Sequence, residues 1–334
     1  MTNLLAKTVL SLEVGELNLI TLACLAGTLL LGRLLFSFLH LLYTITLRPR
    51  ADLSKYGAKK GAWAVVTGAS DGIGKEFAVQ LAKAGFNLVI LARTESKLET
   101  VKKTVVEKYA VECKVVPFDF AKATEKEYEG LSGTLAPLDV GVLVNNVAVN
   151  HEFPTPFALE SESLLASIVE VDVAAQVRLT RMLLPHLTSR SQTNRKNGGL
   201  ILNVGSVAGL IPSPYLATYS GAKAFLRTWS RALAVECRQH NVHVEHIKTY
   251  FVSTAMSKIR KASLLAPTPA TYVHSVLSGA GNSADSASYP PHAILTWALE
   301  NLVPESIAIE KSGDMHLGLR KRALRKKERE AKAL

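Results

Sequence analysis

The stretch AWAVVTGASDGIG (62–74) decides the fold of this chain. Its first six residues are apolar or β-branched, which is typical of a buried strand. Glycines follow at positions 68, 72 and 74, and residues 74–84 then place apolar side chains on one helical face until Gly85. This order brings glycines and a helix N-terminus close to a bound pyrophosphate. The stretch therefore predicts a Rossmann-type α/β domain that binds a dinucleotide.

The next predicted strand, residues 87–92, indicates which dinucleotide binds. A site for NAD usually carries Asp or Glu about 20 residues after the glycines, where it holds the ribose 2′-hydroxyl. Here that position is Ala92, and Arg93 follows it. A guanidinium pairs with a 2′-phosphate, whereas a carboxylate would repel it. The pattern predicts NADPH as the cofactor; the alternative is that Arg93 only solvates the end of a strand.

Three further residues have the spacing of a carbonyl-reducing site. Ser206 follows a predicted strand at 200–204, and Tyr219 and Lys223 lie one turn apart on a predicted helix at 216–237. A nearby ammonium lowers the pKa of a tyrosine, which makes the phenol a better proton donor at neutral pH. A serine hydroxyl can orient the substrate oxygen. We therefore expect Tyr219 to donate a proton, Lys223 to tune its pKa and Ser206 to orient the carbonyl.

These motifs resemble the short-chain dehydrogenase/reductase superfamily over about residues 62–260. The matching segments are TGASDGIG (67–74), Asp119 in PFDF, NNVA (145–148), Ser206 and YSGAK (219–223). The resemblance implies a set of residues around the cofactor, to which Arg93 is added. The set is Gly68, Ser70, Asp71, Gly72, Ile73, Gly74, Arg93, Asp119, Asn145, Tyr219, Lys223, Val252 and Thr254, with Asp119 and Asn145 on the adenine side and Val252 and Thr254 at the nicotinamide.

Two long segments suggest a narrower family. Residues 205–233 and 250–269 resemble the membrane-bound very-long-chain 3-oxoacyl-CoA reductases, and the basic end of the chain (320–334) is similar to their fungal members. The resemblance implies reduction of a 3-oxoacyl-CoA in fatty-acid elongation, alongside a condensing enzyme, a 3-hydroxyacyl-CoA dehydratase and an enoyl reductase. The 17β-hydroxysteroid dehydrogenases share much of the pattern, so reduction of a ketosteroid is an alternative, as is a weakly catalytic scaffold.

The sequence departs from the superfamily pattern at three places. Ala148 replaces a usual glycine, and Tyr250-Phe251 stands where Pro-Gly is common. The third departure is Asp172, which occupies the position of the asparagine that supports the proton relay. An ionised Asp172 is expected to perturb Lys223, whereas a role through the backbone carbonyl alone would make the change mild.

The order of predicted elements defines the domain organisation. Strands and helices alternate from 62 to 249, which predicts one doubly wound parallel sheet. The catalytic domain is expected at 62–260, between a basic linker at 48–61 and a substrate or membrane-proximal region at 261–310. Within that region, residues 278–288 are small and polar and predict a mobile loop. A helix is expected at 292–303, where it would cover an acyl chain, enter the membrane or pack on the core.

An apolar segment near the N-terminus predicts a membrane anchor. Residues 17–47 are long enough to span about 30 Å of hydrocarbon as a helix, although Arg33 interrupts them. No basic residues cluster before the segment as they would in a signal peptide, and a core helix this apolar would lack a surface to pack on. Basic residues follow at 48–60, so residues 1–16 are expected in the lumen and the catalytic domain in the cytosol, at the endoplasmic reticulum.

The net charge of +11 is concentrated at the other end of the chain. Eight Lys or Arg and two Glu lie between Arg320 and Lys332, within a tail at 311–334. This basic run is expected to form a solvated helix or to lie against anionic lipid headgroups. No nucleic-acid motif accompanies the charge, so nucleic-acid binding is not expected. The three cysteines are scattered, without metal or redox spacing, which predicts a site without metal in a reducing compartment.

Overall fold

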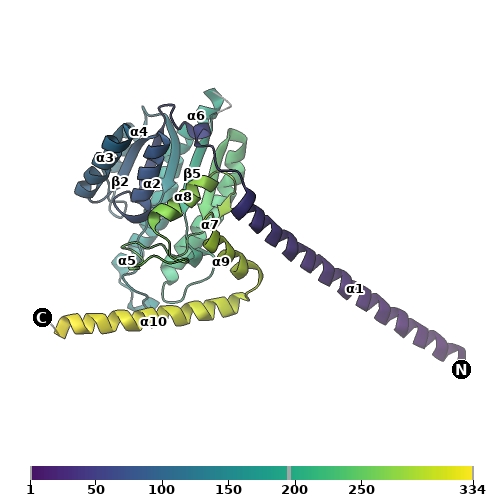
Figure 1. Ribbon diagram of the computed structural model, residues 1–334. Coiled ribbons are helices and arrows are strands. Elements are labelled where there is room, and N and C mark those ends of the chain that lie inside the picture. Colours follow the sequence, from purple (N-terminus) through teal and green to yellow (C-terminus); the bar gives the residue numbers. More distant parts are fainter. Residues whose placement is uncertain (1, 194–196, 333–334) are drawn as a thin grey trace. The chain divides into compact units, whose positions relative to one another are not determined.

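The computed structural model describes residues 2–193 and 197–332, with side chains from residue 18 onward (Figure 1). The chain divides into two compact units, Met1–Arg48 and Pro49–Leu334. The second unit holds a seven-stranded sheet in which every neighbouring pair of strands is parallel. The strands are β1 (Trp63–Thr67), β2 (Asn87–Ala92), β3 (Cys113–Pro117), β4 (Val140–Asn145), β5 (Gly199–Val204), β6 (Val242–Ile247) and β7 (Asp285–Ser286).

The strand order is β3-β2-β1-β4-β5-β6-β7. The chain builds outward from β1 to β3 and then returns to place β4 on the other side of β1. Ligands of doubly wound sheets bind at such a reversal, beyond the carboxyl ends of the strands. The predicted doubly wound sheet is therefore confirmed, and its topology places a ligand cleft beyond the ends of β1 and β4.

Helices cover both faces of the sheet. One face carries α2 (Gly72–Ala84), α3 (Glu95–Tyr109) and α8 (Pro269–Gly279), and the other carries α4 (Glu125–Leu135), α6 (Ala175–Thr193) and α7 (Ala217–Cys237). A short α5 (Glu162–Val169) leads into α6 through a π-helical turn, Glu170–Ala174. Two further helices end the chain, α9 (Pro290–Asn301) and α10 (Glu305–Lys332).

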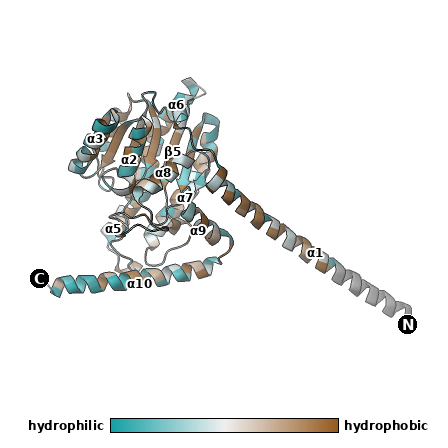
Figure 2. Cartoon of the chain, viewed as in Figure 1, coloured by the Kyte–Doolittle hydropathy of each residue, from teal (hydrophilic) through white to brown (hydrophobic). Residues whose placement is uncertain are grey.

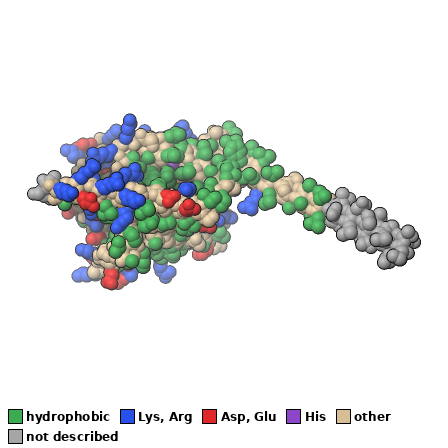
Figure 3. Space-filling view, turned by 90° about the horizontal axis from the view of Figure 1, so that it is seen from below, with side chains coloured by type: hydrophobic (Ala, Val, Ile, Leu, Met, Phe, Trp, Pro, Cys, Tyr) green, Lys and Arg blue, Asp and Glu red, His purple; other side chains and the backbone are tan. Residues whose placement is uncertain are grey.

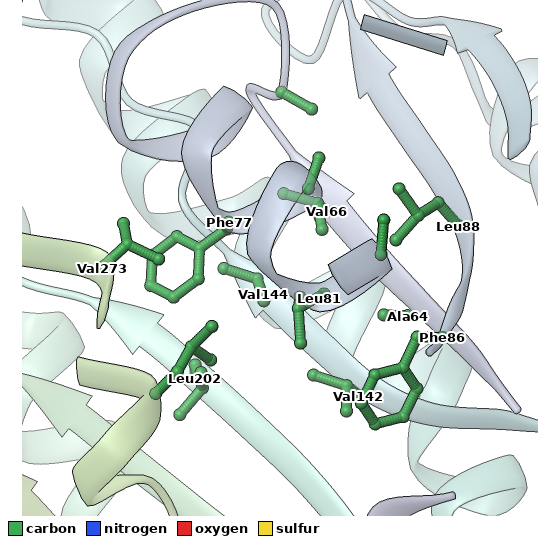
Figure 4. Close-up of a cluster of buried hydrophobic side chains, with 14 of the residues drawn as sticks. Ala64, Val66, Phe77, Leu81, Phe86, Leu88, Val142, Val144, Leu202 and Val273 are labelled. Atoms are coloured by element: carbon green, nitrogen blue, oxygen red, sulfur yellow. The ribbon is translucent and has the colours of Figure 1, made fainter. Parts of the chain in front are cut away.

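Alternation along the strands fills two cores, one on each face of the sheet. Ala64 and Val66 of β1 point toward α2, where Phe77 and Leu81 are fully buried (Figure 4). Neighbouring Val65 belongs to the opposite core. Strands buried on both faces read as continuous apolar runs, which is why 62–67 showed no alternation.

The first unit is a helix of its own. Helix α1 (Thr2–Leu42) continues as a π-helical turn, Tyr43–Leu47. Its segment Asn18–Leu47 has a mean hydropathy of 2.1 and is apolar along its length (Figure 2). At 1.5 Å per residue, 30 residues extend about 45 Å, more than the roughly 30 Å of a hydrocarbon core. By length and composition this helix can cross a membrane.

One expectation for the C-terminal third needs correction. The segment 278–288 is not simply a loop, because it includes the end of α8 and strand β7, which pairs with β6. Helix α10 packs on the rest of the second unit where His316 is buried, and the His316 ring bonds the carbonyl of Pro214 at 2.8 Å. Residues 321–332 of the same helix are almost all exposed. Helix α9 also packs on the rest of this unit, with His292 and Thr296 fully buried or nearly so.

Candidate active site

The glycine turn between β1 and α2 is closely packed. Gly68 has a φ of +65°, a conformation that favours glycine, and its backbone lies against Val147. A side chain on Gly74 would place its Cβ 2.2 Å from the carbonyl oxygen of Gly68. Asp71 caps α2 by accepting a 2.7 Å hydrogen bond from the Gly72 N–H. The turn therefore presents backbone without side chains next to the N-terminus of α2, an arrangement that suits binding of a pyrophosphate.

Two consecutive asparagines at the end of β4 make different contacts, and only the second holds the glycine turn. Asn145 is fully buried, and its amide donates to Thr180 at 2.9 Å and to Asn203 at 2.8 Å. Its side chain thus ties β4 to β5 and α6 instead of facing a cofactor. Asn146, which the sequence analysis did not single out, donates from its side chain to the carbonyl oxygens of Thr67 and Gly68.

The predicted catalytic residues come from the loop after β5 and from helix α7. Ser206 follows β5, and Tyr219 and Lys223 lie on the first two turns of α7. The Lys223 ammonium lies 5.5 Å from the centre of the Tyr219 ring and donates to the Val204 carbonyl at 3.4 Å. The structure thus brings the serine-bearing loop, the phenol and the ammonium together.

A serine that the sequence analysis missed ties these two elements together. The Ser220 hydroxyl donates to the carbonyl of Ala208 at 2.5 Å and accepts from the N–H of Ser213 at 3.1 Å. Both partners lie in the segment after β5, so Ser220 fixes α7 against the loop that carries Ser206. Its adjacency to Tyr219 was the only signal in the sequence, and adjacency alone does not predict a contact.

Asp172 is part of the same cluster. It lies in the π-helical turn between α5 and α6, fully buried, with its carboxylate 3.3 Å from the Lys223 ammonium. The same carboxylate accepts a 2.6 Å hydrogen bond from the Val149 N–H. The extra residue of a π turn is a common device at functional sites, and here it aims an acidic side chain at the lysine.

Burial and charge set the proton affinities of the cluster. Burial raises the pKa of Tyr219, and the charge of Asp172 adds to this, while Lys223 and a hydrogen bond from Ser206 oppose it. Burial alone would lower the pKa of Lys223, but the Asp172 carboxylate raises it above its ordinary value. Burial also raises the pKa of Asp172 itself, against the effects of Lys223 and Val149. Tyr219 is therefore protonated at neutral pH, as a proton donor must be.

The residues predicted around the adenine lie at the ends of adjacent strands. Ala92 ends β2 opposite Pro117 of β3, and Arg93 beside it is exposed. Asp119, two residues beyond β3, accepts a 3.2 Å hydrogen bond from the N–H of Ala121. Arg93 and Asp119 thus both lie beyond the carboxyl ends of the parallel strands β2 and β3.

A cavity of about 1130 Å³ borders the glycine turn. Asp71 and Gly72 line one side of it, and Thr254, from the segment after β6, lines another. Val252 is buried in the adjacent core, and the Ser257 hydroxyl donates to its carbonyl at 2.6 Å. Ile73 packs partly against the same core, and Ser70 is half-buried in the turn. The cavity thus borders the glycine turn, whereas Ser206 and Tyr219 are not among its lining residues.

The fold and this arrangement define an oxidoreductase that acts on carbonyl and hydroxyl groups. The chain belongs to the short chain dehydrogenase family, whose profile matches residues 62–264.

Among individual proteins, the chain is 46% identical to the very-long-chain 3-oxoacyl-CoA reductase of Coprinopsis cinerea over 310 residues, 90% of each chain. Solved structures are similar in fold. One, from a study of 7beta-hydroxysteroid dehydrogenase stereoselectivity, has a TM-score of 0.68 and 23% identity, and covers 76% of this chain and 97% of its own. A metagenomic short-chain oxidoreductase in complex with NADP has a TM-score of 0.56 and 27% identity, over 68% and 96% of the two chains.

Proposed function

We propose that this protein reduces very-long-chain 3-oxoacyl-CoA to 3-hydroxyacyl-CoA with NADPH, as the reductive step of fatty-acid elongation. The chemistry is supported by the joint placement of Tyr219, Lys223 and Ser206. The observation that carries the choice of substrate is the 46% identity, across nine tenths of both chains, to a relative that bears this activity in its name.

Each residue of the cluster has a role in the proposed reaction. The Ser206 hydroxyl donates a hydrogen bond to the C3 carbonyl oxygen and fixes the face of the ketone. The cofactor supplies the hydride to C3 when it is bound. Tyr219 gives its proton to the oxygen that becomes the hydroxyl, and the Lys223 ammonium stabilises the phenolate left behind. Asp172 holds Lys223 charged, so that the ammonium is in place at each turnover.

NADPH is the cofactor that the adenine edge supports. No carboxylate stands at the end of β2, where Ala92 is buried, and the exposed Arg93 next to it is able to pair with a 2′-phosphate. A fold neighbour in complex with NADP agrees with this choice. The remaining cofactor contacts assigned above, to Gly68, Ser70, Asp71, Gly72, Ile73, Gly74, Asp119, Val252 and Thr254, belong to the same proposal.

The proposed location is the endoplasmic reticulum membrane, with the catalytic unit in the cytosol. The apolar segment Asn18–Leu47 supports an anchor, and the basic residues at 48–60 support a cytosolic side by the positive-inside rule. Residues 1–16 then lie in the lumen. The partners in this setting are the condensing enzyme that supplies the 3-oxoacyl-CoA, the dehydratase that consumes the 3-hydroxyacyl-CoA and the enoyl reductase that acts after the dehydratase.

A comparison of substrates tests the proposal. The purified protein should oxidise NADPH with a 3-oxoacyl-CoA much faster than with a ketosteroid, and Ala92→Asp should shift its preference toward NADH. Faster turnover of the ketosteroid would favour a hydroxysteroid dehydrogenase. No turnover of either substrate would favour a scaffold.

A further inference from the structure

The cavity beside the glycine turn has a basic rim that extends away from the turn. Lys75 of α2, Lys258 and Arg260 of the segment after β6, and Lys326 of α10 all line it. The cavity also has two acidic residues, but Asp71 caps α2 and Glu76 accepts a 2.7 Å hydrogen bond from Gln80. Four positive and two negative formal charges thus line the cavity, a net charge of +2.

Contacts with the loop after β4 place α10 at this rim. The Lys327 ammonium lies 2.6 Å from the Glu152 carboxylate and 4.8 Å from the centre of the Phe153 ring. Arg320 donates to the carbonyl of Pro154 at 3.0 Å. Lys258 donates to the backbone carbonyl of Glu152 at 2.7 Å, so the same loop holds both basic elements.

Two neighbouring lysines of α10 differ in their contacts. Lys327 is engaged with the loop after β4, whereas Lys326 lines the cavity and, within the described residues, forms one ion pair, with the exposed Glu330 at 3.5 Å on its own helix. Figure 3 shows the basic side chains gathered over the C-terminal part of α10. The contacts of Lys327 and Arg320 with the loop after β4 hold this part of α10 beside the cavity.

From this arrangement we infer that Lys326 and Arg260 bind phosphate groups of the coenzyme A portion of the substrate. The inference rests on the proposed function. An acyl-CoA carries a pyrophosphate and a 3′-phosphate at the end remote from the reacting carbonyl, and cations pair with such groups by charge-assisted hydrogen bonds. The dinucleotide cofactor also carries phosphates, but the glycine turn and Arg93 account for those. Helix α10 thus forms one side of the substrate site, and it recognises the coenzyme A portion of the substrate and not the acyl chain.

Two thioesters with the same acyl group test the inference. The full-length protein in neutral detergent is given NADPH with 3-oxodecanoyl-CoA or with the 3-oxodecanoyl thioester of N-acetylcysteamine, which has no phosphate. Lys326→Glu should raise the KM for the CoA ester about five- to tenfold, since charge reversal turns attraction into repulsion. The KM for the N-acetylcysteamine ester and the KM for NADPH should not change. Arg260→Glu, on a separate element, should behave in the same way.

The control variant is Lys332→Glu, which makes the same charge change on α10 but does not line the cavity. It should leave every KM unchanged. The inference is overturned if Lys326→Glu affects both thioesters equally, if it raises the KM for NADPH, or if it only weakens binding to phosphatidylserine vesicles. A wild-type protein that reduces neither thioester nor a very-long-chain 3-oxoacyl-CoA would refute the proposed function instead, which separates the two failures.

Discussion

At the residue scale, the cluster depends on a buried pair of opposite charges. The Asp172 carboxylate lies 3.3 Å from the Lys223 ammonium, and both side chains are excluded from solvent. Removing one member of a buried ion pair leaves the other charge buried without a partner, which destabilises the folded protein. The carboxylate acts on Tyr219 as well, because its charge raises the pKa of the phenol. In the proposed reaction Asp172 therefore acts on Tyr219 through its charge.

Asp172→Asn tests this coupling. The amide keeps the shape and can still accept the hydrogen bond from Val149, but it removes the negative charge. Because that charge raises the pKa of both Tyr219 and Lys223, both pKa values should fall. Reduction needs protonated Tyr219, so its rate falls as pH rises through that pKa, and the alkaline limb of the pH–rate profile should move to lower pH.

The control for this prediction is Glu170→Gln, which neutralises a carboxylate in the same π-helical turn but away from Lys223. It should leave the profile in place. An Asp172→Asn profile that overlays the wild type would mean that only the backbone of this turn matters. A gain of activity from an inactive wild type would favour the scaffold.

At the element scale, the sequence predicted the strands and helices that carry the site to within one or two residues. Their apolar periodicity and capping residues are local signals, so strand β2 and helix α7 were found with little error. The sequence did not predict the π-helical turn at Glu170–Ala174, β7 or the packing of α10. Strand β7 and the packing of α10 depend on contacts between residues far apart in the chain, such as His316 with Pro214, which no periodicity reveals.

The same reasoning explains the outcome at Asn145. A motif indicates that a residue belongs near a site, but only the packing of β4 against β5 and α6 shows that its side-chain N–H groups donate to Thr180 and Asn203. The adjacent Asn146 instead supports the glycine turn. The glycines themselves were predictable, because positive φ and close backbone contact leave few alternatives.

Gly74→Ala tests the close packing of the glycine turn. The new Cβ would lie 2.2 Å from the Gly68 oxygen and 2.4 Å from the Asn146 side chain, so the backbone must move. Overpacking of this kind costs about 1–3 kcal/mol, and here it also displaces the proposed pyrophosphate site. NADPH affinity, measured by fluorescence titration, should fall together with the melting temperature.

Gly130→Ala provides a matched control in α4, where a Cβ meets nothing within 4 Å. Because alanine favours a helix over glycine by roughly 0.5–1 kcal/mol, this variant should be slightly more stable and bind NADPH normally. Unchanged NADPH affinity in Gly74→Ala would show that the turn does not form the cofactor site.

At the scale of the whole molecule, the chain joins an apolar helix to a unit with its own core. The proposed catalytic residues, both hydrophobic cores and the contact of α10 with Pro214 all lie within Pro49–Leu334. The helix of the first unit, by contrast, exposes large apolar side chains such as Leu29 and Phe36, each 73% exposed. Such a surface is stable in lipid and unfavourable in water.

Deletion of residues 1–47 should therefore release the protein from membranes without unfolding it. The truncated protein is expected in the soluble fraction after cell lysis, with a single cooperative melting transition and retained NADPH binding. Full-length protein in sealed microsomes should lose its catalytic unit to added protease. Protection of that unit would place it in the lumen, and a truncated protein that still sediments with membranes would mean that another surface binds lipid.

The central claim is that Tyr219 donates the proton in reduction of a 3-oxoacyl-CoA, and one measurement tests it most directly. Wild-type and Tyr219→Phe proteins are mixed with NADPH and a long-chain 3-oxoacyl-CoA, and formation of the 3-hydroxyacyl-CoA is followed by mass spectrometry. The wild type should convert the substrate, with one NADPH oxidised for each product formed. Tyr219→Phe should bind NADPH as tightly but lose at least about 100-fold in rate, the usual contribution of a general acid. A variant that keeps more than about a tenth of the wild-type rate, a barrier change of less than about 1.4 kcal/mol, would contradict the account.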